Sequence, residues 1–273
     1  MFIRSIRLKN LMLVAGAALL GLALGIGVLF LGAKAAQSGG EPAPPESALP
    51  PESTGSQQTM GTDVPEDGEK VVYLTFDDGP SVVTGEILDV LKEKGVPATF
   101  FVIGATTERG KGLYQRILDE GHALGIHSYS HRYQEIYESA DAYLADFDRL
   151  ADHLESIVGI KPNIFRFPGG SKNNFATPEV LDEIKKEMEK RGCVWFDWNA
   201  LAKDDKAKAT PAQEMFDNVV SSAGDQEKIL ILLHDDALRT TAAECVSMLI
   251  DHYQGLGYRF EALTAETNPI HLK

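Results

Sequence analysis

The sequence predicts an α/β fold in which parallel strands alternate with helices and close into a barrel. From residue 71 onward, seven short apolar runs alternate with longer stretches of helical period. Such βα units imply parallel strands joined by right-handed crossovers, in either a barrel or an open doubly wound sheet. Polar residues stand at the ends of five runs, and only a barrel brings such ends around one mouth, so we favour the barrel. The expected strands are 71–76, 98–103, 123–126, 164–167, 193–197, 229–233 and 258–260, and the polar residues are Asp77, His127, Arg166, Asp197 and His234.

Residues 1–36 predict a cytoplasmic stub followed by a transmembrane anchor. The run Leu11–Ala33 carries no charge, and a helix of that length spans about 34 Å, enough for a hydrocarbon core of about 30 Å. Three basic residues precede the run and only Lys34 closely follows it, which places the rest of the chain outside the cytoplasm. The alternative is a signal peptide cleaved near Ala33-Lys34-Ala35, which would make the protein secreted. The run is longer than a usual signal-peptide core, which favours a single-pass anchor in the cell membrane.

Residues 37–69 predict a disordered linker, and residues 70–267 a single folded domain. The linker is rich in Pro, Glu, Ser and Gly and contains few large apolar residues, so it cannot bury enough surface to fold. The formal net charge of −14 and the lack of a Lys/Arg cluster exclude nucleic acid as an expected partner. The two cysteines, Cys193 and Cys245, are expected to be buried free thiols.

Three helices have recognisable ends in the sequence. Apolar residues from Leu144 to Val158 follow helical spacing, and Gly159 stands where a terminating glycine is expected. Thr177-Pro178 and Thr210-Pro211 each predict a helix start, with threonine as the N-cap and proline in the first turn. The second threonine is also expected to form a capping box with Gln213.

Two motifs carry most of the functional information. Asp77-Asp78-Gly79 follows the first strand, and His127 and His131 stand four residues apart after the third. Two imidazoles and one carboxylate make a three-ligand metal site with an open position, and a second carboxylate beside it can act as a base. An acidic turn and two surface histidines are the alternative interpretation. Two histidines with a carboxylate would also suit non-haem Fe(II), although the paired aspartates and His234 favour hydrolysis.

Three further strand ends have polar or glycine-rich sequences that would be unremarkable alone. Arg166-Phe167-Pro168-Gly169-Gly170 supplies a permanent charge and exposed backbone N–H groups. Leu232-Leu233-His234-Asp235 supplies a histidine that could act as a general acid near neutral pH. Asp197-Trp198 ends the strand between them in sequence, and core packing of Trp198 is the simpler interpretation.

Together, in this order, the five motifs resemble those of the polysaccharide deacetylase family, the carbohydrate esterases of family 4 with a NodB homology domain. The resemblance covers about residues 70–265. It implies a distorted (β/α)7 barrel and a metal-dependent hydrolase that acts on carbon–nitrogen bonds other than peptide bonds. By resemblance, the metal is a divalent ion, usually Zn²⁺, with Co²⁺ or another divalent ion as alternatives, and its ligands are Asp78, His127 and His131.

The resemblance also implies a role for each remaining motif residue. Asp77 is the expected catalytic base, oriented and kept charged by Arg166. The backbone N–H of Gly169 is expected to face the oxyanion, although many family members carry a bulkier residue there. His234 is the expected general acid, tuned by Asp197. Trp198 and Leu232 are expected to wall the pocket for the acetyl methyl group.

The expected function is removal of N-acetyl groups from cell-wall glycan, with N-acetylglucosamine or N-acetylmuramic acid of peptidoglycan as the favoured substrates. The membrane anchor and linker favour this substrate because they place the domain at the wall. Deacetylation of chitin-like oligomers or of O-acetylated xylan is the alternative activity. A non-catalytic glycan-binding relative is a further alternative, disfavoured because the expected base and all three ligands are present.

Overall fold

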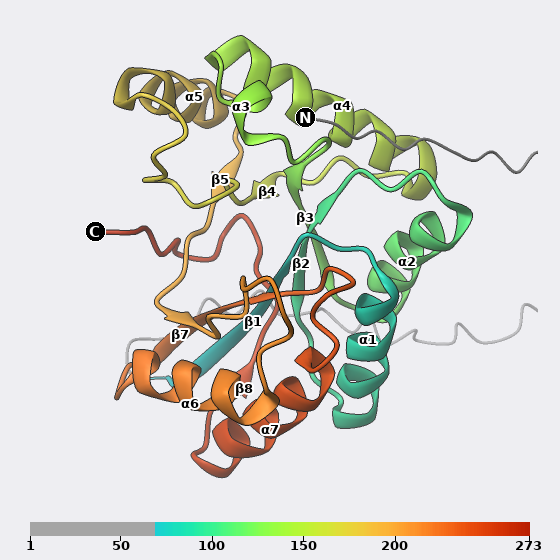
Figure 1. Ribbon diagram of the computed structural model, residues 1–273, viewed down its shortest axis with the longest axis vertical. Helices are drawn as coiled ribbons and strands as arrows, with labels where there is room; N and C mark the ends of the chain where they lie inside the picture. The colour runs from blue at the N-terminus through green and yellow to red at the C-terminus, as the bar shows by residue number, and fades with distance from the viewer. Residues whose placement is uncertain (1–68) are drawn as a thin grey trace, which may run out of the picture. The chain divides into compact units, whose positions relative to one another are not determined.

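A computed structural model describes residues 69–273, which form a curled sheet of parallel strands covered by helices (Figure 1). The strand order is β5-β4-β3-β2-β1-β7-β6, and β8 also pairs with β1. The strands are β1 Val71–Asp77, β2 Thr99–Ile103, β3 Ala123–Ser128, β4 Ile164–Phe165, β5 Val194–Trp195, β6 Ala200–Leu201, β7 Lys228–His234 and β8 Arg259–Phe260. The helices are α1 Val82–Lys94, α2 Glu108–Asp119, α3 Tyr133–Ile136, α4 Ala140–Val158, α5 Pro178–Lys190, α6 Ala212–Ala223 and α7 Ala242–Gly255.

The sheet curls like a barrel but is not closed by hydrogen bonds. All seven expected strands are present in part, and the unexpected short strand β6 lies at one end of the strand order, with β5 at the other. Within the described residues no strand ladder joins β5 to β6, so the sheet is a curled half-barrel. This is consistent with the distorted (β/α)7 barrel that the resemblance implies, but the sheet is not closed as we expected. The segment 270–272 lies beside this opening (Figure 1), where the Asp197 N–H donates to the Ile270 carbonyl at 2.8 Å and the His271 ring stacks on Trp195 at 4.5 Å.

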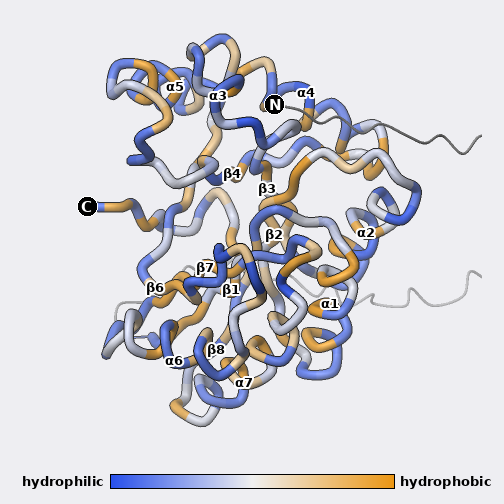
Figure 2. The backbone as a smooth tube through the Cα atoms, viewed as in Figure 1, coloured by the Kyte–Doolittle hydropathy of each residue, from blue (hydrophilic) through white to orange (hydrophobic). Residues whose placement is uncertain are grey.

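Alternating side chains of the central strand β1 supply two separate apolar cores. Val72, Leu74 and Phe76 face the helices and belong to the larger cluster, whereas Val71 and Tyr73 face the inside of the curl. This alternation follows from the period of two in a strand. Because both faces are buried, every residue of β1 is buried. The helices alternate between hydrophobic and hydrophilic colours along the backbone in Figure 2, as expected for helices with one buried face.

The expected helix ends are confirmed in two cases and wrong in one. Gly159 ends α4 in the left-handed conformation, and the Thr177 side chain caps α5 by accepting from the Val180 N–H. At α6, however, Pro211 is the N-cap and no side chain caps the helix. The Thr210 hydroxyl donates instead to the Lys203 carbonyl at 3.4 Å, so the expected capping box does not form.

The N-terminal anchor and the linker to residue 68 lie outside the described residues, and the expected boundary at residue 267 stays a prediction. Between residues 69 and 273, no helix has both the length and the apolar character that crossing a membrane requires. Both cysteines are free thiols; Cys245 is buried in α7, whereas Cys193 is only half-buried before β5.

Candidate active site

The end of β1 brings two carboxylates into one pocket. Asp77 is the last residue of the strand and is 3% exposed. Asp78 has a φ of +76°, in the left-handed region, which lets its side chain turn to the same side as that of Asp77 although successive strand residues point to opposite faces. Gly79 follows, and a methyl group there would overlap the carboxylate of Asp235. The turn therefore requires glycine at position 79.

Arg166 holds Asp77 in place, as the resemblance implies. Its guanidinium is fully buried and donates to Asp77 Oδ1 at 2.9 Å and to the Thr75 hydroxyl at 2.7 Å. Burial raises the pKa of Asp77 above its ordinary value, and the charge of Arg166 opposes that shift. The result is a carboxylate that is a better proton acceptor than an exposed aspartate and still has a paired cation.

Asp78, His127 and His131 converge as a metal site requires. Within the described residues they are the one group of such side chains close enough to share an ion, with one atom from each within 4.8 Å of the others. Asp78 Oδ1 lies 3.4 Å from His127 Nε2 and 3.1 Å from His131 Nε2. Asp78 Oδ1 and His131 Nε2 are buried without a hydrogen-bond partner. Unpartnered buried ligand atoms are costly, and a divalent cation would satisfy them, so these residues fit a metal ion.

The protonation state of His127 also suits a ligand. Its Nδ1 lies 2.9 Å from the Arg166 carbonyl oxygen, which can only accept, so Nδ1 carries the proton and Nε2 presents a lone pair to the site. Burial lowers the pKa of His127 to about 3, so the ring is neutral at physiological pH. The expected ligand set is therefore assembled with the correct tautomer.

The loop between the two histidines is held by an aspartate that the motifs did not indicate. Asp146 of α4 accepts from the Ser128 hydroxyl at 2.6 Å, the Tyr129 N–H at 2.7 Å and the Ser130 N–H at 2.9 Å. The Ser128 hydroxyl in turn accepts from the His131 N–H at 2.9 Å. This network fixes a loop in which His131 has a φ of +53°. Asp146 is therefore a positioning residue for the metal ligands.

His234 lies opposite Asp77, but its carboxylate partner is Asp204 and not Asp197. Strands β1 and β7 pair with Asp77 beside His234. His234 Nδ1–H donates to Asp204 Oδ1 at 2.8 Å, and the His234 backbone N–H donates to Asp204 Oδ2 at 2.9 Å. Although burial lowers the pKa of His234, the hydrogen bond and charge of Asp204 raise it to about 9. His234 is thus a cation at neutral pH, as a general acid must be.

Asp197 was expected to tune His234, but its carboxylate contacts other residues. Its carboxylate accepts from the Ser171 N–H at 2.8 Å, the Ser171 hydroxyl at 2.5 Å and the Leu272 N–H at 2.9 Å. Its backbone carbonyl accepts from the Arg166 guanidinium at 3.0 Å. With these contacts the Asp197 side chain fastens the loop after β4 to residues 270–272 and does not contact His234.

The expected wall residues surround a pocket of about 240 Å³. Trp198, Leu232 and Gly169 line it together with Asp77, Asp78, His127 and His234. The lining residues that sequence reasoning missed are Tyr133, Leu201, Lys203, Asp204 and Asp205. Gly169 has a φ of +77°. The direction of its N–H toward a substrate oxygen stays a prediction. A metal ion held by Asp78, His127 and His131 would share the pocket with a carboxylate and an imidazole, Asp77 and His234, that can accept and donate protons, as hydrolysis of an amide or ester requires.

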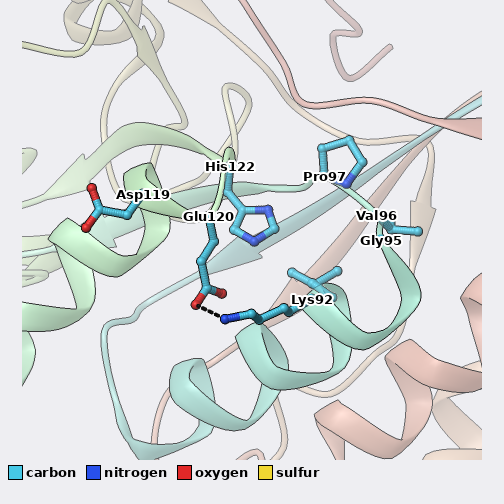
Figure 3. Close-up of a pocket in the computed structure, with 8 residues that line it drawn as sticks. Lys92, Gly95, Val96, Pro97, Asp119, Glu120 and His122 are labelled. Carbon is cyan, nitrogen blue, oxygen red and sulfur yellow. Dashed lines mark ion pairs between the residues drawn. The ribbon is translucent and has the colours of Figure 1, made fainter.

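A second pocket, of about 450 Å³, lies at the amino ends of the strands (Figure 3). It is formed where α1 and α2 end, before the amino ends of β2 and β3, and its ion pair joins Lys92 to Glu120 at 3.8 Å. The His122 Nδ1 there accepts from the Ala98 N–H at 3.2 Å, so the ring is engaged with the backbone. This pocket holds no group comparable to the metal triad, which leaves the pocket at the carboxyl ends of the strands as the active site.

Comparison with known proteins agrees with this geometry. A family model described as polysaccharide deacetylase matches residues 65–189. The Bacillus subtilis protein YheN is 34% identical over 208 residues, covering 75% of this chain and 71% of that protein. A peptidoglycan-N-acetylglucosamine deacetylase of Bacillus cereus is 31% identical over 203 residues, covering 73% and 71%. Among solved structures, the catalytic domain of peptidoglycan N-acetylglucosamine deacetylase from Eubacterium rectale superimposes with a TM-score of 0.72 and 31% identity, covering 78% of this chain and 97% of that domain. The chain therefore belongs to the polysaccharide deacetylase family.

Proposed function

We propose that this protein is a membrane-tethered, metal-dependent hydrolase that removes N-acetyl groups from peptidoglycan, at N-acetylglucosamine or N-acetylmuramic acid. The observation that carries the proposal is that one pocket brings together the buried carboxylate of Asp77, the imidazole of His234 paired with Asp204, and a group of three side chains that could share a metal ion. Two of the similar proteins are peptidoglycan N-acetylglucosamine deacetylases, which supports the wall glycan as substrate.

The two proton transfers fall to residues at the ends of two neighbouring strands. Asp77, at the end of β1, accepts the proton of the attacking water. His234, beside it at the end of β7, donates a proton to the departing amine, which is a poor leaving group until it is protonated. The N–H of Gly169 donates to the oxygen that becomes negative as water adds to the acetyl carbon. Acetate leaves and a free amino sugar remains.

The ligand triad would hold a divalent ion, and we propose Zn²⁺. Two imidazole nitrogens and one carboxylate oxygen with an open position match the ligand types and number of catalytic zinc sites. When bound, the ion supplies a Lewis acid for the acetyl carbonyl and makes water more acidic. Asp78 contributes the negative charge of the triad, while Asp77 keeps its own carboxylate paired with Arg166 and available for the proton.

The membrane attachment is proposed from the sequence. An uncharged run at Leu11–Ala33 followed by a Pro- and Ser-rich linker would keep the domain at the outer face of the membrane, within reach of the wall. The same domain released by a signal peptidase would act in the medium. Fractionation of cells that make the full chain distinguishes the two, since only the anchored form stays with the membranes at its full mass.

The function is tested by acetate release from purified peptidoglycan fragments, chitin oligomers and acetylated xylan, each with and without a chelator. We expect release from peptidoglycan that stops on chelation and returns on addition of Zn²⁺. Mass spectrometry of the digested fragments shows whether the glucosamine or the muramic acid has lost its acetyl group. Absence of release from every peptidoglycan preparation by the metal-loaded protein would overturn the proposal, and release from xylan alone would replace it with the O-deacetylase activity.

A further inference from the structure

A solvent-exposed aromatic side chain stands beside the active-site pocket. Phe175 is 53% exposed, and the centroid of its ring lies 4.2 Å from that of Tyr133. Tyr133 lines the pocket, and its ring lies edge-on to the ligand His131 at 5.0 Å. A continuous aromatic surface therefore extends from the metal triad through Tyr133 to Phe175 and out to solvent.

The two rings occupy the space next to Gly169. A Cβ built at Gly169 would lie 3.3 Å from a ring carbon of Tyr133 and 3.3 Å from a ring carbon of Phe175. A larger side chain at position 169 would therefore have to displace one of these rings, and its backbone φ of +77° also disfavours one. Glycine at position 169 therefore leaves room for the two rings beside the pocket.

Phe175 is presented by an ordered turn. The Asn173 side-chain oxygen accepts from the N–H of Phe175 at 2.9 Å and from that of Ala176 at 3.3 Å. The Asn173 side-chain amide donates to the Gly170 carbonyl at 2.9 Å. These bonds tie the turn to Gly170, the neighbour of the pocket-lining Gly169, so the ring keeps its position beside the pocket although half of it faces water.

We propose that Tyr133 and Phe175 form a stacking platform for the sugar ring next to the one being deacetylated. The CH face of a pyranose is apolar and its hydroxyl edges are polar, which suits a flat aromatic wall with polar groups around it. The exposed Asp205 also lines the pocket and can accept hydrogen bonds from sugar hydroxyls. The inference rests on the proposed function and adds to it a second sugar subsite.

The test compares Phe175→Ala and Phe175→Tyr with a matched control, Leu256→Ala. Leu256 is 51% exposed and follows α7, near the amino ends of the strands and away from the pocket. Each protein is assayed on N-acetylglucosamine monosaccharide and on long oligomers. We expect Phe175→Ala to raise KM for long oligomers by about 3- to 10-fold with kcat unchanged, which is the size of a lost aromatic contact. Phe175→Tyr and Leu256→Ala should stay near wild type, and the monosaccharide should not distinguish the four proteins.

A binding measurement separates this inference from the proposed function. In an Asp77→Asn background, which keeps the platform, calorimetric titration with a long oligomer should show the same loss of affinity when Phe175→Ala is added. Equal affinity and equal KM for Phe175→Ala and wild type on long oligomers would overturn the platform. If the wild-type protein releases no acetate from any glycan, the proposed function fails, and the titration alone still decides whether the platform binds sugar.

Discussion

Replacing Asp204 with asparagine tests the pairing that sequence reasoning did not find. In the wild-type protein, burial lowers the pKa of His234, but the hydrogen bond and charge of Asp204 raise it to about 9. Asparagine keeps an oxygen that can accept from His234 Nδ1–H and removes the charge. We therefore expect the pKa of His234 to fall toward or below the ordinary histidine value of about 6.5, because burial remains and its largest opposing influence is lost.

The size of the effect follows from the fraction of His234 that carries a proton. At pH 8, a group with a pKa of about 9 is about nine-tenths protonated, whereas a group with a pKa of about 6.5 is about 3% protonated. The protonated ring is the form that can donate to the leaving amine. We therefore expect kcat/KM at pH 8 to fall by about 30-fold or more in Asp204→Asn, and by much less near pH 6.

The assay is a pH–rate profile for wild type, Asp204→Asn and the control Asp205→Asn, which changes an exposed neighbour at the same pocket. The basic limb of the wild-type profile should lie near pH 9 and should move down only in Asp204→Asn. NMR titration of the imidazole gives the pKa directly. An unchanged basic limb in Asp204→Asn, with metal content and folding intact, would refute the assignment of His234 as the acid tuned by Asp204.

Three further changes address the base and the metal site. Asp77→Asn should retain bound metal by elemental analysis while turnover falls by about 10²- to 10⁴-fold, and activity near wild type would show that Asp77 is not the base. His127→Ala removes one of three ligands, so the metal content should drop well below one ion per chain; stoichiometric zinc after dialysis would contradict the ligand set. Asp146→Ala leaves three donors of the ligand loop without their acceptor, so chelator competition should show a metal affinity about 10- to 100-fold weaker. Asp152→Ala, an exposed change on the same helix, should leave that affinity unchanged.

The long strands were predictable and the closure of the sheet was not. Buried β1 and β7 appear in the sequence as continuous apolar runs, because strands covered on both faces need no polar alternation. Strands β4, β5 and β6 contain only two residues each, too few for any periodicity. Whether β5 and β6 pair depends on the distance between these two terminal strands of the sheet. The hydrophobic pattern of the sequence does not predict that distance.

Two similar Thr-Pro sequences show the same limit at helix starts. Thr177 caps α5 as expected, whereas the Thr210 hydroxyl contacts a carbonyl of Lys203, seven residues earlier in a loop. The local sequence favours a cap in both places. The difference is that the folded loop places the Lys203 carbonyl oxygen within reach of the Thr210 hydroxyl. That placement depends on tertiary structure.

The metal triad could be predicted because its members lie at, or within three residues of, the carboxyl ends of β1 and β3. The partner of His234 could not, because Asp197 and Asp204 both follow β5 in sequence and either would reach from a suitable loop. The choice is made by β6, whose Leu201 pairs with Leu232 of β7 and so brings Asp204 to the next strand's end. Asp146 was missed for a different reason, since one aspartate on a half-exposed helix face resembles ordinary surface charge.

The opening between β5 and β6 has a practical consequence for anyone preparing this domain for crystallisation or assay. Leu272 donates its N–H to the Asp197 carboxylate, the Asp197 carbonyl accepts from Arg166, and Arg166 is paired with the Asp77 base. Trimming the domain at residue 267, where the sequence suggests a boundary, would remove the first of these links. If a domain shortened in this way folds but has a low turnover rate, residues 268–272 should be restored before any catalytic motif is changed.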